Sequence, residues 1–175
     1  PDHLIAGPTN WLDLQTRNDD FFPDDARAYF KSLYFDDFSD DIVATLSEYA
    51  AAAPSALTAV EIHHLEGAFG RVDEDETAFG NRDARYLLNI RGTWMSSVED
   101  AANIGWVRDT WSAMERYARG GHYANFLGHE EEREARAQAR DSYPPKTWDR
   151  LVELKNEWDP LNLFRLNRNI PPSRL

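Results

Sequence analysis

Three segments in which apolar side chains recur at every second position constrain the fold of this chain more than any other feature. Residues 28–35, 57–65 and 86–94 are rich in aromatic and β-branched side chains and lie between polar turns, a pattern typical of β-strands. Residues 39–50 and 97–118 instead repeat apolar side chains every three to four positions, which predicts helices that each bury one face. The order strand, helix, strand, strand, helix predicts an α+β domain, in which helices pack on one face of an antiparallel sheet.

The ends of both helices carry their own signals. Ser39 precedes the first helix as an N-cap, and Pro54 stops it because proline cannot continue the hydrogen-bond ladder. Ser97 and Asp100 resemble a capping box with Asp in place of Glu, and we expect the glycine pair at 120–121 to end the second helix.

Beyond the glycine pair the pattern changes to short segments broken by prolines. Residues 123–127 form a short aromatic run, residues 130–140 are charged and helix-prone, and residues 146–158 carry a last amphipathic helix. We therefore expect an α+β domain over residues 1–120, followed by a C-terminal helical arm over residues 121–175.

The composition excludes several classes of function. A formal net charge of −12 argues against nucleic-acid binding, which requires clustered cations, and the absence of cysteine removes disulfides and thiolate metal sites. No apolar run approaches the roughly 18 residues of a membrane span, and the start Pro-Asp-His-Leu does not resemble a signal peptide. We therefore expect a cytoplasmic protein that binds neither nucleic acid nor a membrane.

The C-terminal region contains three short motifs in a fixed order. They read WDRLVELK over residues 148–155, WDPLNLF over residues 158–164 and NRNIP over residues 167–171. The order is similar to the terminal signature of the berberine-bridge-like family of FAD oxidases, R-L-x-x-L-K, then D-P-x-N-x-F, then N-x-N-I-x-P. In physical terms the Asp-Pro pair and Asn162 favour a stop and a turn, and Phe164 is expected to be an apolar anchor.

The resemblance continues upstream of these motifs. Residues 120–126, GGHYANF, resemble the family's G-G-x-Y-x-N-F stretch, and residues 28–32 resemble its Y-x-K-S strand. Residues 77–83, TAFGNRD, resemble the T-A-x-x-x-R-D segment of bacterial members. The similarity thus covers most of the chain.

The resemblance implies a two-lobed flavoprotein, in which FAD is bound mainly by an N-terminal lobe that this chain lacks. Residues 1–120 then form the substrate lobe, and residues 121–175 return to complete the FAD-binding lobe. The implied function is that of an FAD-linked oxidase, which transfers a hydride from a small alcohol, sugar or amine to flavin, with O2 as acceptor. The alternative is a stand-alone α+β domain that binds a ligand without redox chemistry.

One apparent motif has a different interpretation. Arg119 and the three residues after it, Gly-Gly-His, look like the family's flavin-attaching R-x-G-G-H sequence. That motif belongs to the N-terminal lobe, whereas here Tyr-x-Asn-Phe follows at once. We interpret the glycine pair as a helix-ending turn.

Tyr123 and Asn125 are the residues to which the resemblance assigns chemistry. The family places a tyrosine of this stretch beside the flavin, which implies Tyr123 as the catalytic base; its phenol requires a partner, because an ordinary phenol is a weak base at neutral pH. Asn125 is implied as a flavin ligand, because an amide both donates and accepts hydrogen bonds. The alternatives are a core tyrosine and an asparagine that ends a turn.

Glu61, His63 and Lys31 are the candidate substrate-binding residues. Strand geometry places Glu61 and His63 on one face, which the resemblance implies to be the substrate wall, and a neutral His63 can accept the proton of Tyr123. The alternative for His63 is an ordinary surface or core histidine. Lys31 interrupts an aromatic strand and either faces solvent or enters the site as a cation.

Two further expectations complete the sequence analysis. We expect no metal site, because the histidines at 63, 64, 122 and 129 and the acids at 130–132 lack the spacing of known ligand motifs, and neighbouring strand residues point to opposite faces. The apolar side chains of the arm are expected to form an exposed patch that covers the substrate lobe or a second copy of the chain. The patch comprises Leu151, Leu154, Trp158 and Phe164.

Overall fold

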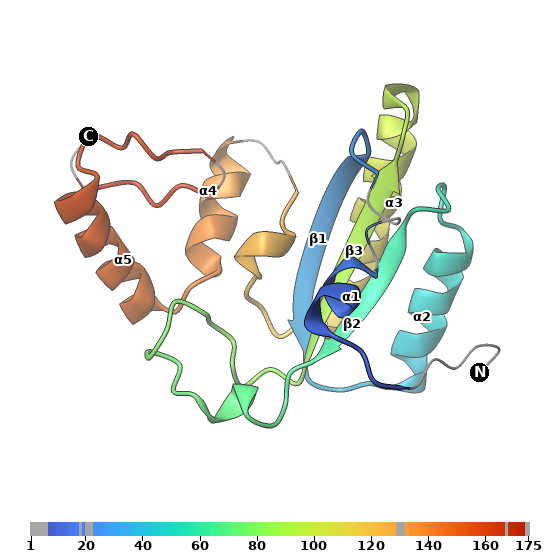
Figure 1. The fold of residues 1–175 in the computed structure, drawn as a ribbon, viewed down its shortest axis with the longest axis horizontal. Coiled ribbons are helices and arrows are strands. Elements are labelled where there is room, and N and C mark those ends of the chain that lie inside the picture. Colours follow the sequence, from blue (N-terminus) through green and yellow to red (C-terminus); the bar gives the residue numbers. More distant parts are fainter. Residues whose placement is uncertain (1–6, 18, 20–22, 129–131, 167, 174–175) are drawn as a thin grey trace.

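A three-stranded antiparallel sheet forms the centre of the computed structural model, which describes residues 7–17, 19, 23–128, 132–166 and 168–173. The strands are β1 (Arg27–Phe35), β2 (Ala59–His64) and β3 (Tyr86–Trp94), in the order β1-β3-β2 (Figure 1). β1 begins one residue before the predicted strand, β2 lies within the predicted one, and β3 has the predicted bounds. The α+β fold class is confirmed.

β3 is the central strand, and both of its faces are covered. It pairs with β1 from Arg27 opposite Trp94 to Phe35 opposite Tyr86, and with β2 from Ala59 opposite Arg91 to His64 opposite Tyr86. From Leu87 onward every residue of β3 is buried. Because side chains alternate, its even-numbered residues face one side of the sheet and its odd-numbered residues the other.

Helices α2 (Asp40–Ala51) and α3 (Asp100–Met114) cover the face of the even-numbered β3 residues (Figure 1). Leu88 and Ile90 are fully buried there against Val107 of α3. The burial of such side chains is the main source of stability for a domain of this kind, at roughly 1.5–3 kcal/mol for each large aliphatic residue. The prediction of helices on one face is confirmed.

The start of the second helix differs from the prediction. A short 3-10 turn, Ser97–Glu99, precedes α3, and the capping box uses Ser96 and Glu99 in place of Ser97 and Asp100. Asp100 instead accepts hydrogen bonds from the Arg27 guanidinium at 2.6 and 2.7 Å and from the Trp94 indole at 2.7 Å. Asp100 therefore takes part in a tertiary ion pair with Arg27, and not in the cap that the local pattern predicted.

The C-terminal arm contains two helices beside the long connection between β2 and β3. Figure 1 shows α4 (Glu132–Asp141) and α5 (Pro145–Trp158) away from α2 and across the sheet from it, with the connection of residues 65–85 below them. Lys146 of α5 forms an ion pair with Asp75 of the connection. Two short elements lie outside the arm. Helix α1 (Trp11–Thr16) precedes β1, and a 3-10 turn, Phe69–Arg71, belongs to the connection between β2 and β3.

The turn after α5 explains one of the sequence motifs. The Asp159 carboxylate accepts the backbone N–H groups of Leu163 at 2.7 Å and Phe164 at 3.0 Å and pairs with Lys155, so it closes the turn from inside. Asn162 occupies the left-handed region at φ +52°, which asparagine tolerates better than most residues. Phe164, expected as an anchor, is 82% exposed, because no described part of the chain covers it.

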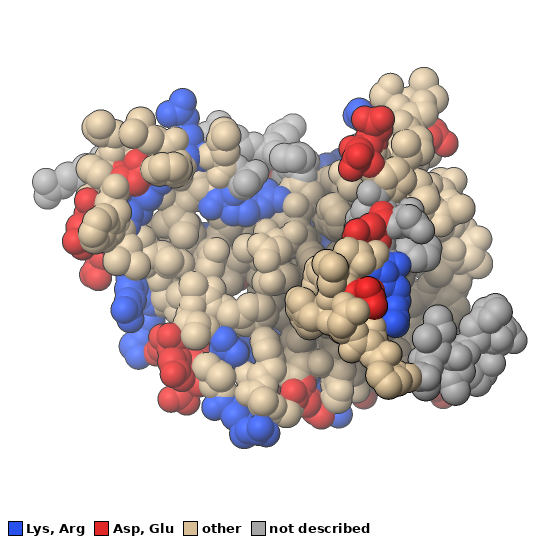
Figure 2. Space-filling model, in the orientation of Figure 1, with Lys and Arg blue, Asp and Glu red and all other residues tan. Residues whose placement is uncertain are grey.

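The charged side chains are distributed over the face of the molecule that Figure 2 shows. Figure 2 shows Lys and Arg in small groups beside acidic residues and broad uncharged stretches, without a continuous basic field on this face. None of the helices in the described ranges combines the length and apolarity needed to cross a bilayer.

Two glycines at the contact between α3 and β3 make a matched pair for testing the core. A Cβ at Gly92 would lie 2.8 Å from the Val107 Cγ2 atom, whereas a Cβ at Gly105 of α3 would meet nothing within 4 Å. We expect Gly92→Ala to lower the free energy of unfolding by about 1–3 kcal/mol, because α3 must move away from the sheet. We expect Gly105→Ala to raise it by roughly 0.5–1 kcal/mol, because alanine favours the helix.

Urea unfolding followed by tryptophan fluorescence measures both changes. Equal effects of the two substitutions would contradict the close approach of α3 to β3.

Candidate active site on the open face of the sheet

Glu61 and His63 lie on the face of the sheet that α2 and α3 leave open. Both belong to β2, where Glu61 is opposite Asn89 of β3 and His63 is opposite Leu87. Glu61 is half-buried and His63 is exposed. The structure therefore places these two predicted residues on one wall.

Asn89 and Arg91 of β3 extend this wall, and sequence reasoning did not select them. The Asn89 amide donates to a Glu61 carboxylate oxygen at 2.7 Å, and the Arg91 guanidinium lies 3.6 Å from the other oxygen. Asn89 is 1% exposed and Arg91 is 6% exposed. The signal was present, because polar residues alternate with aliphatic ones in a strand buried on both faces, where burial of a polar group needs a reason.

Lys31 lies apart from Glu61 and His63. Its β1 position shares the helix-covered face with Leu33 and Phe35, and its ammonium group lies 4.4 Å from the centre of the Trp111 ring of α3. The same group is 3.5 Å from a carboxylate oxygen of Glu134 in α4. Lys31 is therefore buried beside α3 and α4, in a place that neither sequence alternative described.

Tyr123 and Asn125 lie on the segment that returns to the sheet after α3. The expectation of an extended segment differs from the structure, in which Ala124–Phe126 form a 3-10 turn. The two side chains still meet, because the Asn125 amide donates to the Tyr123 hydroxyl oxygen at 2.8 Å. The Tyr123 backbone N–H points to the Ser32 Oγ atom of β1 at 3.4 Å, which attaches the segment to the open face.

A row of aromatic rings connects Tyr123 with the wall of β2. The Tyr123 ring is 5.2 Å from that of Phe79 and 4.9 Å from that of Phe126, and the Phe126 ring is 5.6 Å from that of His63. Phe126 therefore contacts both His63 and Tyr123. The structure brings the two predicted residues into one cluster through this phenylalanine, which lies between them in the row of rings.

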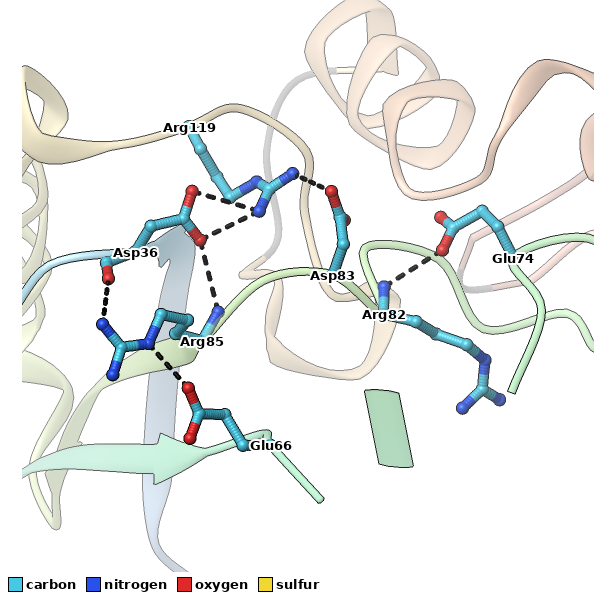
Figure 3. Close-up of polar contacts among 7 residues, drawn as sticks. All are labelled: Asp36, Glu66, Glu74, Arg82, Asp83, Arg85 and Arg119. Carbon is cyan, nitrogen blue, oxygen red and sulfur yellow. Dashed lines mark hydrogen bonds and ion pairs between the residues drawn. The ribbon is translucent and has the colours of Figure 1, made fainter. Parts of the chain in front are cut away.

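Arg119 fixes the position of this segment at the end of the sheet (Figure 3). Its guanidinium group donates to Asp36, after β1, at 2.9 and 3.1 Å and to Asp83, before β3, at 2.6 Å. Arg85 extends the network by donating from its backbone N–H to Asp36 and from its side chain to Glu66 at 2.7 Å. One ion-pair network therefore connects the ends of all three strands with the segment that carries Tyr123.

The glycine pair after Arg119 does not end the helix, which was the sequence interpretation, because α3 ends at Met114 and a 3-10 turn, Glu115–Tyr117, leads into extended Ala118. Gly120 and Gly121 have φ values of +94° and +77°, and a Cβ at Gly121 would lie 2.6 Å from the side chain of Asn81. His122 follows, half-buried, and burial is the main cause that lowers its pKa below the ordinary value. His122 is thus a neutral packed side chain at pH 7.

The tail of the chain supports the same segment from the other side. The Arg168 guanidinium donates to the backbone carbonyl oxygens of Leu127 and Gly128. Arg168 belongs to the last of the C-terminal motifs, residues 167–171. This motif therefore helps to hold the segment that carries Tyr123. Asn167, the first asparagine of that motif, lies outside the described residues.

The side chain of Asn125 has hydrogen-bonding groups that a ligand could use. Asn125 is exposed beside Tyr123, and one amide N–H and the carbonyl oxygen of its side chain are available in addition to the bond with Tyr123. These groups fit the edge of a flavin ring, while the sequence contains neither a G-x-G-x-x-G nor a Walker loop for the phosphates.

Within the described ranges, no group of three or more His, Asp or Glu side chains could hold a metal ion; His129 and acids 130–131 lie outside these ranges.

Substitution of Arg119 tests the attachment of the segment. We expect Arg119→Gln to increase amide hydrogen exchange over residues 120–127 by roughly fivefold, the factor that corresponds to about 1 kcal/mol of local opening free energy. Arg116→Gln is the control, since Arg116 lies three residues before Arg119 and donates to Thr45 at 3.4 Å, away from the segment. Unchanged exchange in the Arg119 variant would show that packing alone holds the segment.

Comparison with known proteins places this geometry among flavoproteins. The family model described as "Berberine and berberine like" matches residues 122–171. The uncharacterized FAD-linked oxidoreductase YgaK of Bacillus subtilis is 31% identical over 136 residues, which cover 78% of this chain and 29% of that protein. Hexose oxidase of Chondrus crispus is 25% identical, with coverage of 85% and 32%.

A solved structure agrees in fold. BBE-like #28 from Arabidopsis thaliana superposes with a TM-score of 0.72 at 18% identity and covers 86% of this chain and 34% of its own. The chain therefore spans about a third of the length of these relatives.

Proposed function

The chain belongs to the berberine bridge enzyme-like family of FAD-linked oxidoreductases, and we propose that it forms the substrate wall and the closing C-terminal segment of an FAD-dependent oxidase. The substrate class is a small alcohol, sugar or amine, and O2 is the electron acceptor. The observation that carries the proposal is the hydrogen bond between Asn125 and the Tyr123 hydroxyl, in an aromatic cluster on the polar open face.

FAD, when bound, supplies an acceptor for the hydride that leaves the substrate carbon. The residues of this chain hold the substrate and move its proton. The Asn125 N–H donates to the Tyr123 oxygen and can stabilise the negative charge that develops there while a proton is transferred. The side chains on the open face of β2 and β3 suit a polyol or an amine, because Glu61 accepts and Asn89 and Arg91 donate hydrogen bonds.

His63 has a substrate-side role in this proposal. Its ring is exposed and contacts Phe126, so it faces the space above the sheet and not the Tyr123 hydroxyl. A neutral imidazole there can accept a hydrogen bond from a substrate hydroxyl. The hexose oxidase among the relatives supports a polyhydroxylated substrate.

Removal of the Tyr123 hydroxyl tests the catalytic role. In the full-length protein with FAD, we expect Tyr123→Phe to fold and to retain flavin, because the ring still packs between Phe79 and Phe126. Anaerobic stopped-flow reduction of the flavin by substrate should slow by on the order of 10²–10⁴-fold, the usual share of general-base catalysis.

Tyr117→Phe is the matched control for this measurement. Tyr117 packs against the helix-covered core, and its ring contacts Arg116 through its face, which phenylalanine preserves. Flavin reduction at the wild-type rate in the Tyr123 variant would remove the catalytic role and leave Tyr123 as a packing residue.

We also propose that the exposed face of the arm is an association surface. Trp158 is 77% exposed, and the side chains of Leu161, Leu163, Phe164 and Leu166 around it are 68–86% exposed. An apolar groove of about 410 Å³ lies between this turn and the last described residues. Contiguous apolar surface of this kind marks an interface, which in the full-length protein is with the flavin lobe.

The 175-residue chain on its own should then associate with itself through the same face. We expect sedimentation velocity to show concentration-dependent dimers, and we expect Trp158→Ser combined with Phe164→Ser to give monomers. The paired control is Trp11→Ser with Leu12→Ser, two side chains of α1 that are 75% and 69% exposed. A strict monomer at all concentrations would contradict the proposal.

A further inference from the structure

A buried phenol, Tyr34 of β1, lies next to the candidate active site and has no role in the chemistry described so far. It is 1% exposed and lies on the open face of the sheet, opposite Leu87 of β3. It lines a small pocket of about 200 Å³ that also contacts Tyr123, Asn125 and Tyr143. Among the residues that the structure describes, none forms a hydrogen bond with the Tyr34 hydroxyl.

The hydrogen bond of Asn125 determines where the proton of Tyr123 can go. Because the Asn125 amide is the donor, the Tyr123 oxygen is the acceptor, and the hydroxyl proton remains to be donated to another group. Phe126 lies between Tyr123 and His63 in the row of rings, which leaves the imidazole in contact with Phe126. The pocket that Tyr123 shares with Tyr34 is the polar space within reach of its hydroxyl.

The pocket has the size and the chemistry to hold water. A water molecule occupies about 30 Å³ of liquid volume and needs two or more polar partners. Three tyrosines, at positions 34, 123 and 143, line the pocket together with Asn125 and Ser142, and each of these residues carries a polar side-chain group. Several water molecules therefore fit between Tyr123 and Tyr34.

We propose that this pocket is the route by which the substrate proton leaves the active site, with Tyr34 as the residue that positions and relays it. This inference rests on the proposed function. As the substrate carbon loses a hydride with both bonding electrons to flavin, the substrate O–H or N–H proton moves to the Tyr123 oxygen. Tyr123 passes its own proton to pocket water and to the Tyr34 hydroxyl, which releases one proton for each that it takes. Both phenols end neutral, and one proton reaches the solvent.

The surroundings of Tyr34 keep it in the neutral state that a relay requires. Burial is the main cause that raises the pKa of Tyr34, and negative charge on Tyr123 and on Glu74 raises it further. Glu74 is held by the backbone N–H groups of Asn81 at 2.6 Å and Arg82 at 3.1 Å (Figure 3). A hydroxyl that stays neutral can donate and accept at once, which a phenolate cannot.

The other charged groups around Tyr34 do not supply a competing base. Burial raises the pKa of Tyr143 across the pocket, so this phenol also stays neutral. Arg119 meets Tyr34 only through its backbone N–H, at 3.0 Å from the Tyr34 carbonyl oxygen, and its cation is paired with Asp36 and Asp83. From the sheet itself, Leu87 separates the Tyr34 position from that of His63.

The test compares Tyr34→Phe with Tyr29→Phe in the full-length flavoprotein. Tyr29 is on the same strand and is 4% exposed, but it lies on the helix-covered face, where its hydroxyl accepts from Arg108 at 3.1 Å. We expect Tyr34→Phe to slow anaerobic flavin reduction at neutral pH by on the order of 10-fold to 100-fold. The rate should recover as the pH rises, and the solvent deuterium isotope effect should increase, because proton release becomes limiting. Tyr29→Phe should change neither.

A second measurement needs no turnover. With tyrosine labelled at ¹³Cζ in the oxidised protein without substrate, the Tyr123 signal should change from phenol to phenolate at a higher pH in Tyr34→Phe than in the wild type. The cause is the loss of a hydroxyl from the network that solvates the phenolate. If Tyr34→Phe fails to fold, 3,5-difluorotyrosine at position 34 keeps the packing and changes only the acidity of the hydroxyl. Because the fluorinated phenol ionises at a lower pH and a phenolate cannot relay a proton, the rate of flavin reduction should fall as the pH rises, at a lower pH than in the wild type.

The outcomes separate this inference from the proposed function. An unchanged pH profile, isotope effect and Tyr123 titration in the position-34 variants, with a slow Tyr123→Phe variant, would overturn the relay alone. Wild-type reduction in Tyr123→Phe would overturn both. Slow reduction in Tyr34→Phe with a pH profile and a Tyr123 titration like those of the wild type would show that Tyr34 acts through packing, and would also overturn the relay.

Discussion

The pairing of β3 with a neighbour on each side is the constraint on which the rest of the structure depends. A central antiparallel strand must present one set of side chains to each face, and here the two sets have different tasks. Tyr86, Leu88 and Ile90 bury under the helices, while Leu87, Asn89 and Arg91 face the open side. A shift of the register by one residue would exchange these sets and would lose the core and the polar wall together.

The candidate site is assembled from parts that are distant in sequence, and ion pairs hold the parts in place. The open face comes from the sheet, whereas Tyr123 comes from the segment after α3, and Phe79 comes from the connection between β2 and β3. Arg119 ties this segment to Asp36 and Asp83, the residues next to two strand ends (Figure 3). Exposed ion pairs contribute little to global stability, but a guanidinium group shared by two carboxylates restricts orientation well, because its donors are fixed in one plane.

Sequence periodicity predicted the strands, the two helices on the sheet and the last helix, because each of these elements buries one regular face. It was wrong for the cap of α3, where Asp100 takes part in a tertiary ion pair with Arg27, which no local pattern reports. It also missed the 3-10 turn after Tyr123, since three residues are too few to show a period. For Lys31, neither sequence alternative described its place on the helix-covered face, because only packing could reveal that Trp111 and Glu134 surround the ammonium group.

Two polar side chains on the open face of the sheet, Asn89 and Glu61, are not explained by the stability of the fold. Asn89 occupies a central strand position at 1% exposure, and its Oδ1 atom has no partner within the described ranges. An unsatisfied buried acceptor costs about 1–3 kcal/mol, and valine or leucine at this position would avoid the cost and would fill the same space. Glu61 of the neighbouring strand β2 is another polar group that the fold does not need. It is half-buried, and its carboxylate lies beside Asn89 and Arg91. Polar groups of this kind persist where binding or chemistry requires them, which supports the proposal that the substrate lies on the open face of the sheet.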